Sequence, residues 1–173
     1  MFDWRENTES ICDAPLTYLT IEDIDGTHPA GAFTTYWNSL NSGIIPDRGQ
    51  FTPQAIPKLL RWLMMFRREL NDNNDEYLLY LQGNSAAELT HGSLQGQYLH
   101  DFTATGCFDT RRDVMRAVLQ TKQPAYACIH VGGNRSEFKT SVTVGAFPMT
   151  DGDKQPQVVM VPAPDSLEMR MHL

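Results

Sequence analysis

The sequence lacks the features that identify secreted, membrane-spanning or metal-binding proteins. It has only three cysteines, Cys12, Cys107 and Cys128, with no CxxC pair and no Cys/His cluster at metal-ligand spacing. An odd number of widely spaced cysteines predicts free thiols, which a reducing cytosol permits. The N-terminus has no basic segment followed by an apolar core, and the apolar run at 62–66 is far too short to span a bilayer. These absences predict a cytoplasmic protein with no membrane contact and no metal ligands.

An excess of positive charge is also missing. Fourteen lysines and arginines stand against 21 acidic residues, which gives a formal net charge of −7. Nucleic-acid binding begins with basic side chains that displace counterions from phosphates, so this balance argues against DNA or RNA as a partner. The two dense basic pairs, Arg67-Arg68 and Arg111-Arg112, lie in amphipathic segments, and we interpret them as solvated faces.

Catalytic signatures are absent as well. The segment Gly92–Gly96 imitates a Gly-x-Ser-x-Gly nucleophile elbow only in part, because Ser93 directly follows the first glycine. No glycine pattern of the phosphate-binding kind occurs. Acidic clusters such as Glu22, Asp23 and Asp25 fall near the N-terminus, where solvated carboxylates are the default. The sequence therefore does not predict an enzyme.

What is present is an ordinary globular composition, 41% hydrophobic and 20% charged, arranged in alternating helical and strand patterns. Helices are predicted at 30–41, after Thr52-Pro53, in short turns at 85–92, and at 110–122 behind an Asp109 cap. Strands are predicted at 61–70, 76–82, 125–131, 137–147 and 157–161. The order predicts one α+β domain at 30–163, with a five-stranded antiparallel sheet and its helices packed on one face.

The sequence also supports predictions for the two flanking segments and for one strand. Residues 1–29 form an N-terminal extension that lies on the main domain or contacts a partner, and 164–173 form a frayed tail. Within 137–147, one face carries Phe138, Val142, Val144 and Ala146, while the other carries Glu137, Lys139, Ser141 and Thr143. This alternation predicts a half-buried strand.

Several short motifs in a fixed order resemble a known family. These are Tyr36-Trp37, Pro46-Asp47-Arg48, Thr52-Pro53 with Leu59-Leu60, the aromatic strand 77–82 ending at Gly83, the Gly92/Gly96 spacing before Tyr98-Leu99, Pro124-Ala125-Tyr126, and a late strand ending at Pro148. Over roughly residues 28–163 the chain resembles the PAS-like domain family of stand-alone sensory proteins from alphaproteobacteria. One position departs from the family pattern, because Tyr80 occupies the place of an arginine, which puts anion recognition there in doubt.

The resemblance implies a sheet that cups its helices around an apolar cavity for a small ligand. The residues expected to line it are Trp62, Met64, Tyr77, Leu79, Leu81, Met115, Leu119, Tyr126, His130, Phe138 and Val142. A filled core of the same residues is the alternative, since each buried side chain of this size stabilises a fold by about 1.5–3 kcal/mol. The aromatic helix at 30–41 is expected to form a homodimer contact through Phe33, Tyr36, Trp37 and Leu40, with burial against its own sheet as the competing interpretation.

The ligand itself is not identified by the sequence. Haem is disfavoured because the helix at 110–122 contains no histidine, and photochemical flavin because Cys107 lacks the Asn-Cys-Arg-Phe context. The leading hypothesis is a sensory or adaptor domain that binds a small molecule or a signalling protein and acts in trans. The alternatives are a small enzyme using His130, Tyr126 and Glu88, or a protein–protein interaction module with a filled core.

Overall fold

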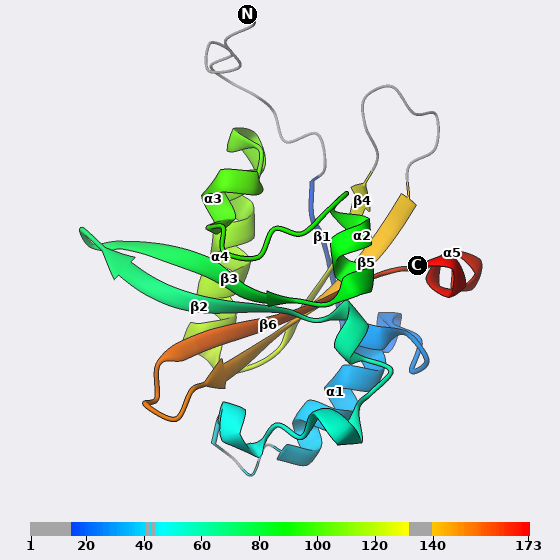
Figure 1. Cartoon of the computed structure of the whole chain (residues 1–173), viewed down its shortest axis with the longest axis horizontal. Helices are drawn as coiled ribbons and strands as arrows, with labels where there is room; N and C mark the ends of the chain where they lie inside the picture. Colours follow the sequence, from blue (N-terminus) through cyan, green and yellow to red (C-terminus); the bar gives the residue numbers. More distant parts are fainter. Residues whose placement is uncertain (1–14, 41, 43, 132–139) are drawn as a thin grey trace, which may run out of the picture.

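The structure is a computed structural model that describes residues 15–40, 42, 44–131 and 140–173. Its centre is one antiparallel sheet of six strands in the order β1-β4-β5-β6-β2-β3 (Figure 1). The strands are β1 (Thr17–Leu19), β2 (Met64–Asn71), β3 (Asn74–Gln82), β4 (Ala125–Val131), β5 (Thr140–Thr150) and β6 (Pro156–Pro164). The α-helices are α1 (Pro29–Leu40), α2 (Asn84–Leu89), α3 (Leu99–Phe102), α4 (Thr105–Thr121) and α5 (Leu167–His172), with short 3-10 turns at Ile21–Asp23, Arg48–Gln50, Pro53–Ala55 and Leu60–Trp62.

Helices cover both faces of the sheet, so the prediction that they pack on one face is wrong. Successive residues of the central strands belong alternately to two buried clusters. Phe147 and Val159 pack in the cluster of α1, whereas Ala146 and Val158 pack in the cluster that contains α2, α3 and α4 residues. Because side chains of a strand alternate between faces, these two clusters occupy opposite sides of one sheet.

The strand at 140–150 is buried on both faces and not on one. Every residue of β5 from Val142 to Met149 is buried, including Thr143 on the face predicted to meet solvent. The cause is its central position between β4 and β6, under α1 on one side and α4 on the other. Residues 142, 144 and 146 nevertheless share one face, as predicted, since all three line the same cavity wall.

The sixth strand comes from the N-terminal extension. Thr17, Tyr18 and Leu19 pair antiparallel with Cys128, Ala127 and Tyr126, which places β1 at the edge of the sheet beside β4. The sequence at 16–21 is compatible with a strand, but a run this short could not be assigned to the sheet from periodicity, so five strands were predicted. Residues 15–29 are thus partly integrated into the sheet.

Two helices differ from their predicted limits. α4 begins at Thr105, five residues before the predicted start, because the buried Cys107 extends its inward face by one turn. It ends where Lys122 adopts a left-handed conformation (φ 58°), two residues before Pro124. The tail predicted to be frayed instead contains α5, which is capped by the Ser166 side chain. No helix in the described ranges is long and apolar enough to cross a membrane.

Local backbone geometry fixes the β2–β3 hairpin and the junction that follows it. Asp72 and Asn73 both have positive φ, as a two-residue hairpin turn requires. Gly83 then passes so close to the Leu60–Trp62 turn that a Cβ atom would lie 2.3 Å from the Leu60 carbonyl oxygen and 2.4 Å from that of Arg61. The outer edge of β3 is covered in part by the loop before α3, which exchanges backbone hydrogen bonds with Leu79 through Gly96 and Gln97.

The His28 side chain links the start of α1 to the end of β6 through two hydrogen bonds. The ring is 3% exposed; its Nδ1 accepts a hydrogen bond from the Ala30 amide at 3.1 Å, and its Nε2–H donates to the Ala163 carbonyl at 3.1 Å. This pattern requires the neutral Nε2–H tautomer. Burial lowers the pKa of His28 below its ordinary value of 6.5, the charge of Arg170 acts in the same direction, and the hydrogen bond to Ala163 opposes the shift.

Replacement of Gly83 by alanine should destabilise the chain strongly. The added methyl group meets backbone carbonyls, which cannot rotate away as a side chain can, so a loss of about 1–3 kcal/mol in the free energy of unfolding is expected. Urea denaturation of Gly83→Ala measures it. Gly152→Ala is the matched control, because a Cβ atom there has nothing within 4 Å and its effect should stay within about 0.5 kcal/mol. Equal effects of the two variants would contradict the packing described at Gly83.

Protonation of His28 should weaken the fold. Since the folded-state pKa lies below the unfolded value, the stabilisation is complete above about pH 6.5 and is lost as the pH falls through 6.5 towards the folded pKa. Urea unfolding at a series of pH values from about 8 to 5 should show this decline. His28→Asn retains a side-chain acceptor for the Ala30 amide but cannot titrate, so its profile should be flatter in that window. An identical pH profile in the variant would assign the decline to other groups.

Candidate functional site

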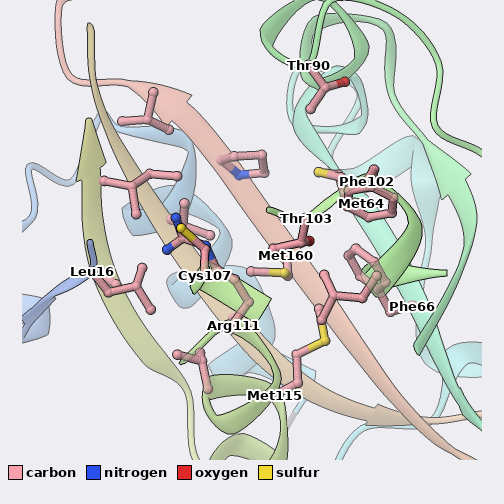
Figure 2. A pocket seen from close by; sticks show the side chains of 18 of the residues that line it. Leu16, Met64, Phe66, Thr90, Phe102, Thr103, Cys107, Arg111, Met115 and Met160 are labelled. Carbon is pink, nitrogen blue, oxygen red and sulfur yellow. The ribbon is translucent and has the colours of Figure 1, made fainter. Parts of the chain in front are cut away.

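A cavity of about 300 Å³ lies between the sheet and the helices α2, α3 and α4. Its floor is formed by side chains that β2, β4, β5 and β6 direct to this face, and Leu16 joins it just before β1 (Figure 2). The floor residues are Leu16, Met64, Phe66, Ala125, Ala127, Ile129, Val142, Val144, Ala146, Met160 and Pro162. Nearly all of this surface is hydrocarbon or thioether, so the cavity suits an apolar molecule.

Small side chains on the sheet create the space. Ala125 and Ala127 on β4 and Ala146 on β5 line the cavity, whereas their neighbours Tyr126 and Phe147 point to the α1 face and fill it. An alanine occupies far less volume than the aromatic side chains of the other face. The two faces of the same strands are therefore packed unequally, solid under α1 and hollow under α4.

The helical wall is built by the inward face of α4 and the segment that precedes it. Cys107, Arg111 and Met115 follow one another at intervals of four residues, so they form one row along the helix, and Val114 lies beside them. The remaining wall residues are Leu89, Thr90, Leu99, Phe102, Thr103 and Ala104. The Thr90 hydroxyl accepts a hydrogen bond from Gln82 Nε2 and lies within bonding distance of backbone carbonyls, which holds the end of α2 in place.

Three of the residues predicted to line a cavity do so: Met64, Met115 and Val142. Tyr77, Leu79 and Leu119 pack in the same cluster but outside the cavity wall. Burial, reinforced by the neighbouring Asp75 carboxylate, raises the pKa of Tyr77 to about 12, so its phenol is neutral at any physiological pH. Phe138 lies outside the residues that the structure describes.

On β4 the prediction selected the wrong face. Tyr126 is buried in the α1 cluster, where its hydroxyl lies 2.7 Å from the Thr34 hydroxyl, and His130 is exposed. The residues of this strand that line the cavity are the alternate ones, Ala125, Ala127 and Ile129. A shift of one residue moves every choice on a strand to the opposite face.

Trp62 and Leu81 also belong to the α1 side, which corrects their predicted position in the cavity. Trp62 sits in the 3-10 turn before β2, at the edge of that cluster. Leu81 is placed there by an irregularity in the β2–β3 pairing, where Met65 faces Leu81 but Phe66 faces Leu79. The residue bypassed is Tyr80, and such a bulge interrupts the strict alternation from which the face of Leu81 was predicted.

The aromatic residues of α1 do not form an exposed patch. Phe33 and Trp37 are each 1% exposed and pack against Phe147, and the indole Nε1–H of Trp37 donates to the Pro148 carbonyl at 3.0 Å. Tyr36 and Leu40 are half-buried. The prediction of a dimer contact through an exposed Phe33 and Trp37 is therefore wrong, and the competing interpretation, burial against the chain's own sheet, is what the structure shows.

Arg111 and Arg112 were interpreted as a solvated pair, and for Arg111 this interpretation is wrong. The sequence analysis did not predict Arg111 as a cavity residue. Arg112 does point away, pairing with Asp109 at 2.7 Å and covering the Phe108 ring. Arg111 lines the cavity. The signal was present in the spacing, because Arg111 stands four residues before Met115 and four after Cys107.

The described cavity wall holds no pairing of a nucleophile with a general base. Cys107 is disulfide-bonded, which corrects the expectation of three free thiols, whereas Cys128 is a free thiol. His130 and Glu88 are exposed and Tyr126 is buried on the opposite face, so this set does not converge. No group of three or more His, Cys, Asp or Glu side chains in the described ranges could hold a metal ion. The arrangement can enclose an apolar molecule and contact one polar end of it.

Comparison with known proteins adds no assignment: no protein-family model matches this chain, and a search of curated proteins gives no match.

Proposed function

We propose that this chain is a PAS-like sensory or adaptor domain that binds a small ligand in the cavity under α4 and acts in trans on another protein. The observation that carries the proposal is the cavity itself, about 300 Å³ in volume and lined almost wholly by apolar side chains. A cavity of this kind is costly to leave in a protein interior, because its walls lose packing contacts, and ligand sites are the common reason for one.

The order of elements supports the family resemblance. Two strands, β2 and β3, lead into the short helices α2 and α3 and then α4, and three further strands, β4, β5 and β6, complete the sheet. Within that sheet β2 lies between β3 and β6, so the N-terminal hairpin is joined to the last strand. In this proposal β1 and α1 are additions to a five-stranded PAS-like sheet, one at its edge and one on its other face.

The motifs that carry the resemblance have structural roles on the α1 side. Trp37 is hydrogen-bonded to the carbonyl of Pro148, so two of the motifs hold each other. The Arg48 guanidinium lies 5.1 Å from the centre of the Tyr80 ring, and the Tyr80 hydroxyl donates to Gln157. Tyr80, which replaces the family's arginine, packs against the α1 cluster and does not line the cavity. In this proposal the ligand therefore does not contact position 80.

A ligand would act by changing how α3 and α4 pack on the sheet. These helices form one wall of the cavity, and the sheet forms the other. A molecule that binds one arrangement of the helices more tightly than another shifts the population towards it, and a partner protein that contacts the outer surface of α4 senses the shift. The proposal includes no catalytic step.

Native mass spectrometry of the chain purified from cells tests ligand binding directly. We expect a discrete additional mass that is lost on denaturation, because the cavity retains an apolar molecule through a mild purification. Absence of any additional mass would shift the assignment to a protein–protein adaptor whose cavity residues serve only as core.

Filling the cavity should separate ligand binding from folding. Ala127→Leu places three more carbon atoms in the space, which should raise the free energy of unfolding of the ligand-free chain by about 0.5–2 kcal/mol and remove the additional mass. Ala117→Leu adds the same atoms to an exposed position of α4 and should retain the mass. A loss of stability of about 1–3 kcal/mol in Ala127→Leu would show instead that the space is not there to fill.

A further inference from the structure

The strand register gathers small side chains on the cavity floor. Ala125 on β4 lies opposite Ala146 on β5, and Ala127, the next residue of β4 on this face, lies opposite Val144. Neighbouring strands are about 4.8 Å apart, and same-face residues of one strand are about 6.7 Å apart, so this part of the floor is comparable in area with the face of an aromatic ring. Because alanine has a single carbon beyond the backbone, a flat group can lie close to the sheet on this alanine platform of Ala125, Ala127 and Ala146.

Methionine side chains border the alanine platform. Met160 on β6 lies opposite Ala146, and Met64 on β2 lies opposite Met160, which continues the row across the sheet. Met115 of α4 belongs to the opposite wall of the same cavity. A thioether sulfur makes favourable contacts with an aromatic ring, often at the ring edge and at about 5 Å. Three thioethers around one space therefore favour an aromatic occupant over a saturated one.

Two aromatic side chains close one side of the cavity. Phe66 on β2 and Phe102 at the end of α3 both line it, with ring centroids 6.4 Å apart and planes inclined by 37°. Figure 2 shows the two rings on one side of Met160. Aromatic rings prefer offset or edge-to-face contacts with centroids about 4.5–7 Å apart. An aromatic occupant can add a ring to this pair, whereas a saturated ring would gain only contact area.

The volume of the cavity sets the size of the occupant. An engineered apolar cavity of about 150 Å³ in another protein holds one benzene molecule. The cavity beneath α4 has a volume of about 300 Å³, twice as large, so it matches a molecule with two rings. A single ring would leave much of the wall without contacts, and three fused rings would require the wall to move.

We infer that the ligand is a flat, two-ring aromatic molecule that lies on the alanine platform with its edges against the cavity methionines and the Phe66–Phe102 pair. This inference rests on the proposed ligand-binding function and names the chemical class of its ligand. 2-Naphthol is a suitable probe, since it has two fused aromatic rings and is uncharged at pH 7. Decahydro-2-naphthol has the same carbon skeleton and hydroxyl group, but its rings are saturated, puckered and thicker.

Isothermal titration of the ligand-stripped full chain with these probes tests the inference. We expect 2-naphthol to bind roughly tenfold or more tightly than decahydro-2-naphthol, because only the aromatic probe gains the sulfur and ring contacts. The three-ring compound 9-phenanthrol should bind more weakly than 2-naphthol although it is more hydrophobic, since the cavity has no room for its third ring.

A single substitution separates the sulfur contact from apolar burial. Met160→Leu replaces the thioether by hydrocarbon of similar volume, so it should weaken 2-naphthol binding about two- to tenfold and leave decahydro-2-naphthol binding unchanged. Met149→Leu is the matched control, because Met149 is buried in the α1 cluster on the opposite face and should not affect either probe. Thermal unfolding of each variant checks that the fold is retained, and if Met160→Leu does not fold, the wild-type preference still decides.

The outcomes separate the ligand class from the proposed function. Decahydro-2-naphthol that binds as tightly as 2-naphthol, or a preference that Met160→Leu leaves unchanged, overturns the aromatic assignment while ligand binding in the cavity stands. Tighter binding of 9-phenanthrol than of 2-naphthol overturns the two-ring size. Failure of all the probes to bind also overturns the inference, and the native mass spectrum, which uses no probe, then decides the proposed function separately.

Discussion

Two-sided burial of β5 and β6 is the constraint on which the rest of the structure depends. These strands occupy the middle of the sheet, and their side chains alternate between two separate clusters, so both faces must be covered before either strand is stable. α1 covers one face and α2, α3 and α4 cover the other. Each buried aliphatic or aromatic side chain contributes about 1.5–3 kcal/mol, so the many buried side chains of these two strands contribute strongly to stability. β4 pairs with β5 and β2 pairs with β6, so β1 and β3 are joined to this central pair through one further strand each.

The two faces of the sheet are packed differently. Under α1 the interior is closed by interlocking aromatic rings, with the Phe33 and Phe147 centroids 4.7 Å apart and the Trp37 indole bonded to the Pro148 carbonyl. Under α4 the alanines of β4 and β5 leave room. The dense packing under α1 stabilises the sheet from one face, while the other face combines a second buried cluster with the cavity. The site is therefore placed on the more loosely packed layer of a scaffold whose opposite layer is dense.

Much of the fold follows from the sequence, and the limits of prediction have physical causes. The alternation at 142, 144 and 146 predicted one face of β5, and the loop left between the strands predicted at 61–70 and 76–82 placed the β2–β3 hairpin. Helices on both faces were not predicted, because Thr143 and Gly145 resemble a solvent-facing row, although Phe147 on the same face is buried under α1. On β4, the aromatic side chains of Tyr126 and His130 led to the prediction of the wrong face. The alanines that line the cavity are small and apolar, and nothing in their residue type predicts a binding site. The bulge at Tyr80 places Leu81 on the face opposite to the one predicted, and no residue type at this position predicts such a bulge. Arg111 could have been found from its spacing to Met115, but its charge suggested solvent.

The placement of the first strand bears on how the chain behaves among other copies of itself. β1 pairs along one side of β4, and its own outer side is only three residues long; at the far side of the sheet, Gly96 and Gln97 occupy backbone groups of β3. Long, flat, unpaired strand edges are templates for intermolecular β-pairing and aggregation. Here one edge is shortened and the other is covered at Leu79, which reduces the backbone available for pairing with a neighbouring chain. The N-terminal segment thus adds a strand to the sheet and at the same time leaves a shorter open edge beside it.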